Sequence, residues 1–158
     1  MDAASGLRRA EGQGGIAPCA AAFEQVFVAA MELIETLKSA IGAQYVLTGK
    51  DTAKWQKDWT GKYHWMPLAV VRPANTEEVS AVARACHDAG MPMVPVGGHT
   101  GLTGATRAQD AIMVSLDRLN RIRAVKPASR IAVVDGGVVL DALHQAAADH
   151  DLVFPLTV

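Results

Sequence analysis

Residues 95–105 read PVGGHTGLTGA, with four glycines and two threonines. Glycine adopts backbone angles that other residues avoid, and it brings the backbone close to a ligand because no Cβ intervenes. Successive N–H groups in such a segment can converge on an anion and form a concave phosphate-binding nest. A tight turn without a ligand is the alternative interpretation. The segment is therefore a candidate binding loop.

Two familiar phosphate-binding motifs do not describe this loop. It lacks the lysine of the G-x-x-x-x-G-K-[ST] motif. It also departs from the Rossmann G-x-G-x-x-G spacing, because it begins with Gly97-Gly98 and leads into an expected strand instead of a helix. A diphosphate bound here would belong to another fold.

The residues before the loop have the pattern of one strand–helix–strand unit. Leu68–Val71 is an apolar run of the length of a buried strand. Asn75 and Glu78 stand at capping-box spacing, and Gly90 ends the helix that they begin. Residues 93–96 supply a second apolar run. A unit of this length predicts two parallel strands with a right-handed crossover.

The residues after the loop predict antiparallel strands and a further helix. Residues 112–116 form a third buried run, and residues 121–125 and 130–135 flank a proline-containing turn, which is typical of a hairpin. Helical spacing returns over residues 139–147, and residues 152–156 have the pattern of another strand. The expected fold class is α+β, with a small parallel βαβ layer followed by antiparallel strands.

The N-terminal part of the chain is less regular. Helical spacing of apolar residues begins at Glu32 and ends at Gly42. Residues 1–30 lack the apolar core and cleavage site of a secretory signal, and we expect them to be a disordered tail that precedes a domain over residues 31–158. Residues 45–66 contain three tryptophans and predict an ordered loop whose aromatic side chains pack on the domain.

Composition restricts the class of protein. The chain has 158 residues, of which 50% are hydrophobic, and a formal net charge of −1, which argues against a nucleic-acid-binding protein. No run of about 18 apolar residues occurs, so no membrane span is expected. Two cysteines are too few for a disulfide framework, which favours a reducing, cytoplasmic location, and Cys86 falls on the apolar stripe of a predicted helix as a buried thiol.

Five segments of the chain, taken together, carry a resemblance. In order they are residues 72–79, 95–102, 115–122, 135–138 and 154–156. They resemble the N-terminal FAD-binding region of FAD-linked oxidases of the vanillyl-alcohol oxidase or p-cresol methylhydroxylase (PCMH) type. Within that type, they are most similar to the branch of D-lactate dehydrogenases, the glycolate oxidase D subunit and D-2-hydroxyglutarate dehydrogenase.

The resemblance implies a cofactor, FAD, and a flavin-dependent oxidoreductase acting on a D-2-hydroxy acid such as D-lactate, glycolate or D-2-hydroxyglutarate. Ala105 departs from the family pattern, which has a second glycine there. The family continues beyond residue 158, so we expect a domain that is incomplete at its C-terminus, and no catalytic residue or metal cluster is assigned. The cofactor contacts that the resemblance implies are Pro95, Val96, Gly97, Gly98, His99, Thr100, Gly101, Leu102, Gly104, Ala105 and Pro155.

Histidines are the remaining candidates for chemistry. His99 lies in the loop, where we expect it to hydrogen-bond the loop or the cofactor, because a general base needs a substrate within reach. His87, His144 and His150 lie on predicted helices as surface or boundary residues. Two other interpretations of the chain stay open: a non-catalytic nucleotide-binding or interaction module, and an inactive truncated fragment. A homodimer is also left open.

Overall fold

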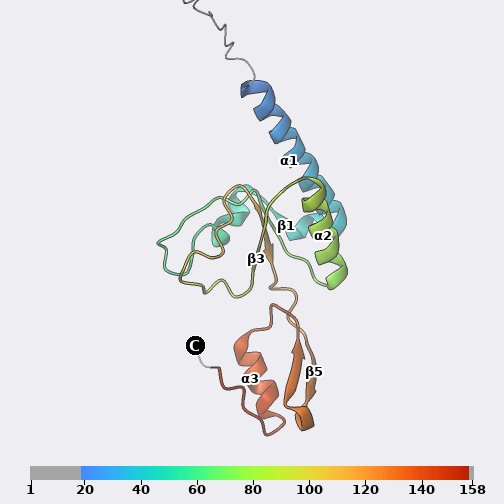
Figure 1. Cartoon of the computed structure of the whole chain (residues 1–158), viewed down its shortest axis with the longest axis vertical. Coiled ribbons are helices and arrows are strands. Elements are labelled where there is room, and N and C mark those ends of the chain that lie inside the picture. The colour runs from blue at the N-terminus through green and yellow to red at the C-terminus, as the bar shows by residue number, and fades with distance from the viewer. Residues whose placement is uncertain (1–18, 157–158) are drawn as a thin grey trace, which may run out of the picture.

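A computed structural model describes residues 19–156, with side chains from residue 28 onward. A sheet with helices packed on it forms one lobe, and a hairpin with a single helix forms a second lobe beyond it (Figure 1). The expected α+β class is confirmed. No helix in residues 19–156 is long and apolar enough to cross a bilayer.

The sheet of the first lobe has the strand order β1-β2-β4-β3. Its central strand, β4 (Ile112–Ser115), runs parallel to β2 (Ala69–Val71) and to β3 (Met93–Val96), while β1 (Val46–Leu47) is antiparallel to β2. The predicted strand–helix–strand unit is confirmed, but β4 lies between its two strands. The carboxyl ends of the three parallel strands emerge at one edge of the sheet, so the chain segments after β3 and β4 leave it side by side.

Two helices cover one face of the sheet. Helix α1 (Cys19–Ile41) buries every fourth residue from Leu33 to Ile41, and α2 (Thr76–Asp88) packs beside it. Alternate residues of β2 and β4 point into the same core, as the two-residue period of a strand requires. The buried residues of this core are Leu33, Leu37, Ile41, Val46, Ala69, Val71, Val82, Cys86, Ile112 and Val114.

The other face of the sheet is covered by residues 48–66 and by Ala108 and Ala111, which follow the glycine-rich segment. Trp55 and Trp65 are buried there against Val70 and Met113. Residues 45–66 are ordered, as predicted, but they include strand β1 and the short helix η2 (Gly49–Trp55). A second short helix, η1 (Ala43–Tyr45), leads into them. The packing predicted for the aromatic residues among them is wrong for Trp59, which is 72% exposed.

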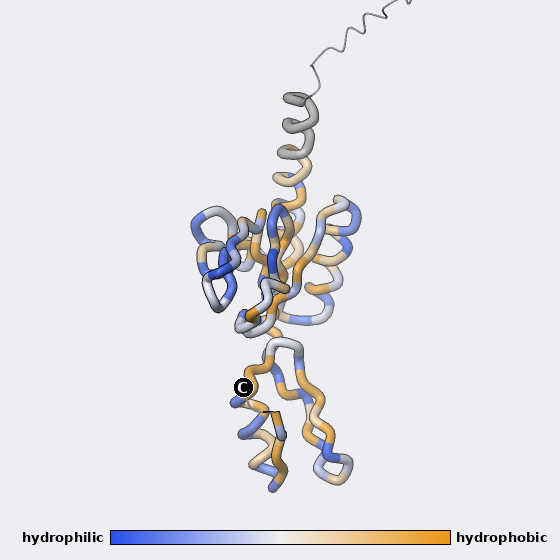
Figure 2. The backbone as a smooth tube through the Cα atoms, turned by 60° about the vertical axis from the view of Figure 1, so that its left-hand side comes forward, coloured by the Kyte–Doolittle hydropathy of each residue, from blue (hydrophilic) through white to orange (hydrophobic). Residues whose placement is uncertain are grey.

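The second lobe consists of β5 (Ile122–Lys126), β6 (Ile131–Val134) and α3 (Leu140–Ala148), with the turn η3 (Pro127–Ser129) between the strands. The predicted hairpin is confirmed, since β5 and β6 pair antiparallel. All four residues of β6 are apolar, as the orange colour along much of the hairpin shows (Figure 2), and all four are exposed.

Helix α1 begins at Cys19, well before Glu32, and runs without a break across the boundary expected between residues 30 and 31. The rest of the expected tail, residues 1–18, lies outside the described residues, and the division into tail and domain stays a prediction. The strand expected at residues 152–156 is wrong: these residues follow α3 without pairing to any strand of the described chain.

Candidate functional site

A cleft of about 660 Å³ lies between the two lobes, which is a typical volume for a ligand site. Its walls come from the loop after β3, the segment after β4, the turn after β6 and the first turn of α3. The residues that line it are Gly97, Gly98, Thr100, Asp117, Asn120, Gly136, Gly137, Val138, Val139, Leu140, Asp141 and His144.

The loop after β3 presents unused donors. Among the described residues, no backbone or side-chain acceptor takes a hydrogen bond from the N–H groups of residues 97–106. A Cβ added to Gly97 would have only the carbonyl oxygen of Gly136, 3.8 Å away, within contact range, and one added to Gly98 only the side chain of Thr100, at 3.9 Å. Free N–H groups in front of open space are what an anion-binding nest requires.

His99 ties this loop to the body of the first lobe. Its backbone is left-handed, with φ of 58°, and its Nε2 lies 2.6 Å from the carbonyl oxygen of Lys57. The imidazole meets the ring of Trp65 edge to face, with 6.0 Å between the centroids. The side chain therefore turns toward the core and does not line the cleft.

The turn after β6 forms the wall opposite the loop. Its anchor is Asp135, a buried carboxylate that accepts hydrogen bonds from Arg121 and Arg123 of the hairpin. Burial raises the pKa of Asp135, but these arginine hydrogen bonds outweigh it and hold the pKa below its usual value. The next residues, Gly136 and Gly137, pass so close to the segment after β4 that a Cβ on Gly137 would overlap the carbonyl oxygen of Leu116.

The first turn of α3 lines the cleft with unpaired N–H groups and one acidic residue, Asp141. Its N-cap residue, Val139, has no side-chain hydrogen bond to offer, and in the part of the chain that the structure describes the N–H groups of Leu140 and Asp141 have no acceptor. A helix N-terminus carries a partial positive charge and is a common site for phosphate groups. One turn later, His144 lines the cleft and places Nε2 2.8 Å from the carbonyl oxygen of Leu156.

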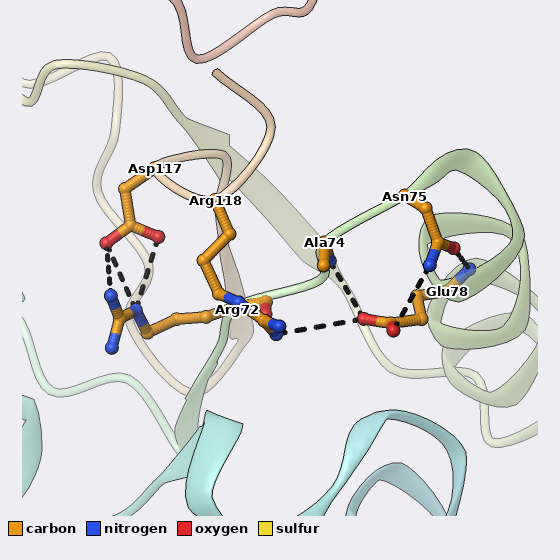
Figure 3. A network of polar contacts seen from close by, with 6 residues as sticks. All are labelled: Arg72, Ala74, Asn75, Glu78, Asp117 and Arg118. Atoms are coloured by element: carbon orange, nitrogen blue, oxygen red, sulfur yellow. Dashed lines mark hydrogen bonds and ion pairs between the residues drawn. The ribbon is translucent and has the colours of Figure 1, made fainter. Parts of the chain in front are cut away.

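The segment after β4 adds a charged side chain to the cleft. The carboxylate of Asp117 faces the guanidinium of Arg72, with Nε 3.0 and 3.2 Å from its two oxygens and Nη2 2.9 Å from Oδ2 (Figure 3). Burial raises the pKa of Asp117, but the hydrogen bonds and the charge of Arg72 outweigh it and lower the pKa. Asp117 is therefore an ionised acceptor at the edge of the cleft.

Arg118 fixes this pair to the start of α2 (Figure 3). Its Nη1 donates to the carbonyl oxygen of Arg72 at 2.7 Å and lies 3.8 Å from Glu78, while its guanidinium stacks 3.3 Å from the ring centroid of Tyr45. Glu78 also accepts from the N–H of Ala74 at 2.8 Å, and Asn75 accepts from the N–H of Glu78 at 2.8 Å. A chain of polar contacts therefore connects the predicted capping pair, through Arg118 and Arg72, to Asp117 in the wall of the cleft.

The structure brings only part of the predicted cofactor set into the cleft. Gly97, Gly98 and Thr100 line it. Val96 is buried in the core, His99 contacts Trp65, and Gly104 lies against the ring of Tyr63. The other predicted residues, which are Pro95, Gly101, Leu102, Ala105 and Pro155, do not line the cleft either.

Several lining residues are missing from the predicted set. Asp117, Asn120, Gly136 and Gly137 belong to segments that carried the resemblance, so their positions were available in the sequence. Nothing in the sequence pointed to His144, which stands on an ordinary amphipathic helix. Over residues 19–156 no three His, Cys, Asp or Glu side chains gather in a way that could hold a metal ion. The unpaired N–H groups of the loop suit an anion, while Asp117 and Asp141 add carboxylates to the lining of the cleft.

Comparison with protein families gives a match to the FAD binding domain over residues 67–158. The chain is 36% identical to the D-2-hydroxyglutarate–pyruvate transhydrogenase of Saccharomyces cerevisiae, over 68% of this chain and 22% of that protein. It is also 36% identical to the D-2-hydroxyglutarate dehydrogenase of Xanthomonas citri pv. viticola, over 78% of this chain and 26% of that protein. The chain thus spans about a quarter of the length of these relatives.

Among solved structures, p-cresol methylhydroxylase with bound substrate matches with a TM-score of 0.69 and 20% identity, over 79% of this chain and 25% of that one. At this identity the likeness concerns the fold. The PCMH-type fold that the resemblance implied is confirmed. The unpaired N–H groups, the open space before Gly97 and the cleft volume all fit the anionic diphosphate of such a cofactor.

Proposed function

Since this chain belongs to the FAD binding domain family, we propose that its cleft holds the diphosphate of FAD between the Gly97-Gly98 loop and the first turn of α3. The observation that carries this proposal is the unpaired N–H groups of Gly97, Gly98 and Thr100, the three loop residues that line the cleft. FAD is the cofactor of the family, and the bound flavin supplies the redox chemistry.

The residues of the chain have separate parts in this grip. The loop N–H groups and the hydroxyl of Thr100 donate to phosphate oxygens, and the N-terminus of α3 adds its partial positive charge from the other side. His99 keeps the loop against the first lobe through Lys57 and Trp65. Asp135 keeps the opposite wall in place through its two arginines.

The whole protein, in this proposal, is a flavin-dependent oxidoreductase that removes hydride from the α-carbon of a small D-2-hydroxy acid, such as D-lactate, glycolate or D-2-hydroxyglutarate. Two matched relatives named for D-2-hydroxyglutarate support this substrate class. The 158 residues supply the diphosphate grip and part of the sheet, so we expect no turnover from them alone. Oxidation of D-lactate or D-2-hydroxyglutarate by this chain would contradict that expectation.

The location and assembly of the protein are also proposed. The low cysteine content supports the cytoplasm, and imaging of a tagged protein would test it, with a mitochondrial signal as the contrary result. A homodimer would appear as a doubled mass in light scattering of the purified chain.

A titration with flavins tests the binding function. The purified chain should bind FAD saturably, with quenching of flavin fluorescence, and should bind ADP by calorimetry because ADP retains the diphosphate. Riboflavin, which has no phosphate, is the control and should bind far more weakly. Equal affinity for riboflavin and FAD would show that the diphosphate does not contribute to binding and that the glycine loop is not the binding site. A folded chain that binds neither would favour a non-catalytic interaction module, and an insoluble chain would favour a truncated fragment.

A further inference from the structure

The cleft has walls of opposite polarity. The loop at Gly97-Gly98 offers unpaired hydrogen-bond donors, and the segment after β4 offers the carboxylate of Asp117. The start of α3 offers both kinds of group, since its unpaired N–H groups stand beside the acidic side chain of Asp141. An ionised carboxylate accepts hydrogen bonds, cannot donate them and repels a phosphate. A ligand that fits both walls therefore carries an anionic group and, beside it, a hydrogen-bond donor.

The carboxylate of Asp117 has hydrogen-bond acceptor positions that its protein partners do not fill. Arg72 gives it two N–H groups, from Nε and Nη2. A carboxylate has about four acceptor positions, so at least one remains for a ligand. The bidentate contact also fixes the direction in which the carboxylate points (Figure 3).

Arg72 is itself fixed from outside the cleft. Its carbonyl oxygen accepts a hydrogen bond of 2.7 Å from Arg118, whose guanidinium is stacked on Tyr45. Arg118 therefore fixes the Arg72–Asp117 pair to the backbone at the end of β2 and to Tyr45. These contacts hold Asp117 in place before a ligand binds.

In FAD, the donors nearest to the diphosphate are sugar hydroxyls: the ribose of the adenosine half on one side and the ribitol of the flavin half on the other. We propose that Asp117 accepts a hydrogen bond from one of these hydroxyls, and that Arg72 is the positioning residue that holds Asp117 for it. The inference rests on the proposed FAD site. It makes Asp117 a residue that distinguishes a sugar-bearing diphosphate from inorganic diphosphate.

The test compares three ligands on the full 158-residue chain. Dissociation constants for FAD, ADP and FMN are measured by calorimetry for the wild type and for Asp117→Asn, Arg72→Gln and the double variant. ADP retains the ribose and FMN retains the ribitol, so the two ligands separate the two sources of hydroxyl. Asp88→Asn, at the exposed end of α2, is the control for the loss of one negative charge. Circular dichroism and urea midpoints verify that each variant is folded.

We expect Asp117→Asn to weaken FAD binding by about ten- to a hundredfold, the value of a hydrogen bond to a charged group. The same loss should appear with either ADP or FMN and be absent with the other. Arg72→Gln should weaken the same ligand, and adding it to Asp117→Asn should cost little more, because both changes remove one interaction. Asp88→Asn should bind as the wild type does.

Two results would overturn the inference while the proposed function stands. One is a folded Asp117→Asn variant whose affinity for FAD equals or exceeds that of the wild type. The other is an equal loss for ADP and FMN, which is the pattern of a merely structural ion pair. A wild-type chain that binds no FAD would overturn the proposed function and this inference together.

Discussion

The backbone N–H of Gly137 donates a hydrogen bond to the carbonyl oxygen of Leu119, with 2.8 Å between nitrogen and oxygen. This contact joins the turn after β6 to the segment after β4 and closes one wall of the cleft. Because the two backbones approach so closely, position 137 has no room for a side chain.

Replacing Gly137 with alanine should destabilise the protein by about 3 kcal/mol or more, because the added Cβ would overlap the backbone at Leu116, which cannot move like a side-chain tip. Urea unfolding followed by circular dichroism measures the loss. Gly101→Ala is the matched control: its Cβ would have no neighbour within 4 Å, and its free energy of unfolding should change by less than about 1 kcal/mol. Equal effects of the two variants would contradict the close approach at Gly137.

Replacing Gly97 with alanine should weaken FAD binding and leave the fold intact. The new Cβ would lie 3.8 Å from the carbonyl oxygen of Gly136, an ordinary contact, so no backbone shift is needed. The methyl group would nevertheless stand between the two glycine walls, where the diphosphate is proposed to lie. We expect a loss of roughly tenfold in affinity, which corresponds to about 1.4 kcal/mol. Unchanged affinity in a folded variant would show that the diphosphate does not lie in this part of the cleft.

Substitutions of His99 should separate its ring contacts from its backbone conformation. Asparagine tolerates the left-handed backbone of this position better than alanine does. His99→Asn should therefore lose only the contacts with Lys57 and Trp65, at a cost of about 1 kcal/mol in stability, whereas His99→Ala should cost more. Both variants should show lower backbone NMR order parameters over residues 97–106, because the loop loses its anchor. Order parameters equal to those of the wild type would show that His99 does not anchor the loop.

The Asp135 carboxylate predicts a dependence of stability on pH. Its pKa is lower in the folded chain than in the unfolded one, so its contribution is complete above the ordinary carboxyl pKa of about 3.9 and is lost as the pH falls from there through the lower pKa of the folded state. The free energy of unfolding of the wild type should therefore fall as the pH drops below about 4 to 5. Asp135→Asn should be less stable than the wild type at neutral pH, and the gap should narrow in acid. A gap of constant size would show that Asp135 does not titrate in this way.

Much of the local structure could be predicted from the sequence. The short apolar runs predicted β2, β3, β4 and the hairpin, and the spacing of Asn75 and Glu78 predicted the start of α2, because each pattern is written within a few neighbouring residues. The glycine-rich segment predicted unpaired backbone donors for the same reason. Residues 152–156 have the apolar pattern of a strand, yet they form none, since a strand exists only with a partner.

Only the tertiary structure decided how these pieces meet. The insertion of β4 between β2 and β3 brings Asp117 beside the glycine loop, and the hairpin then carries Gly136 to within reach of Gly97. The direction of the His99 ring follows from the position of Trp65, which no local pattern contains. The physical reason is that local preferences arise from the backbone and its neighbours in sequence, whereas the cleft arises from packing between segments that are distant in the chain.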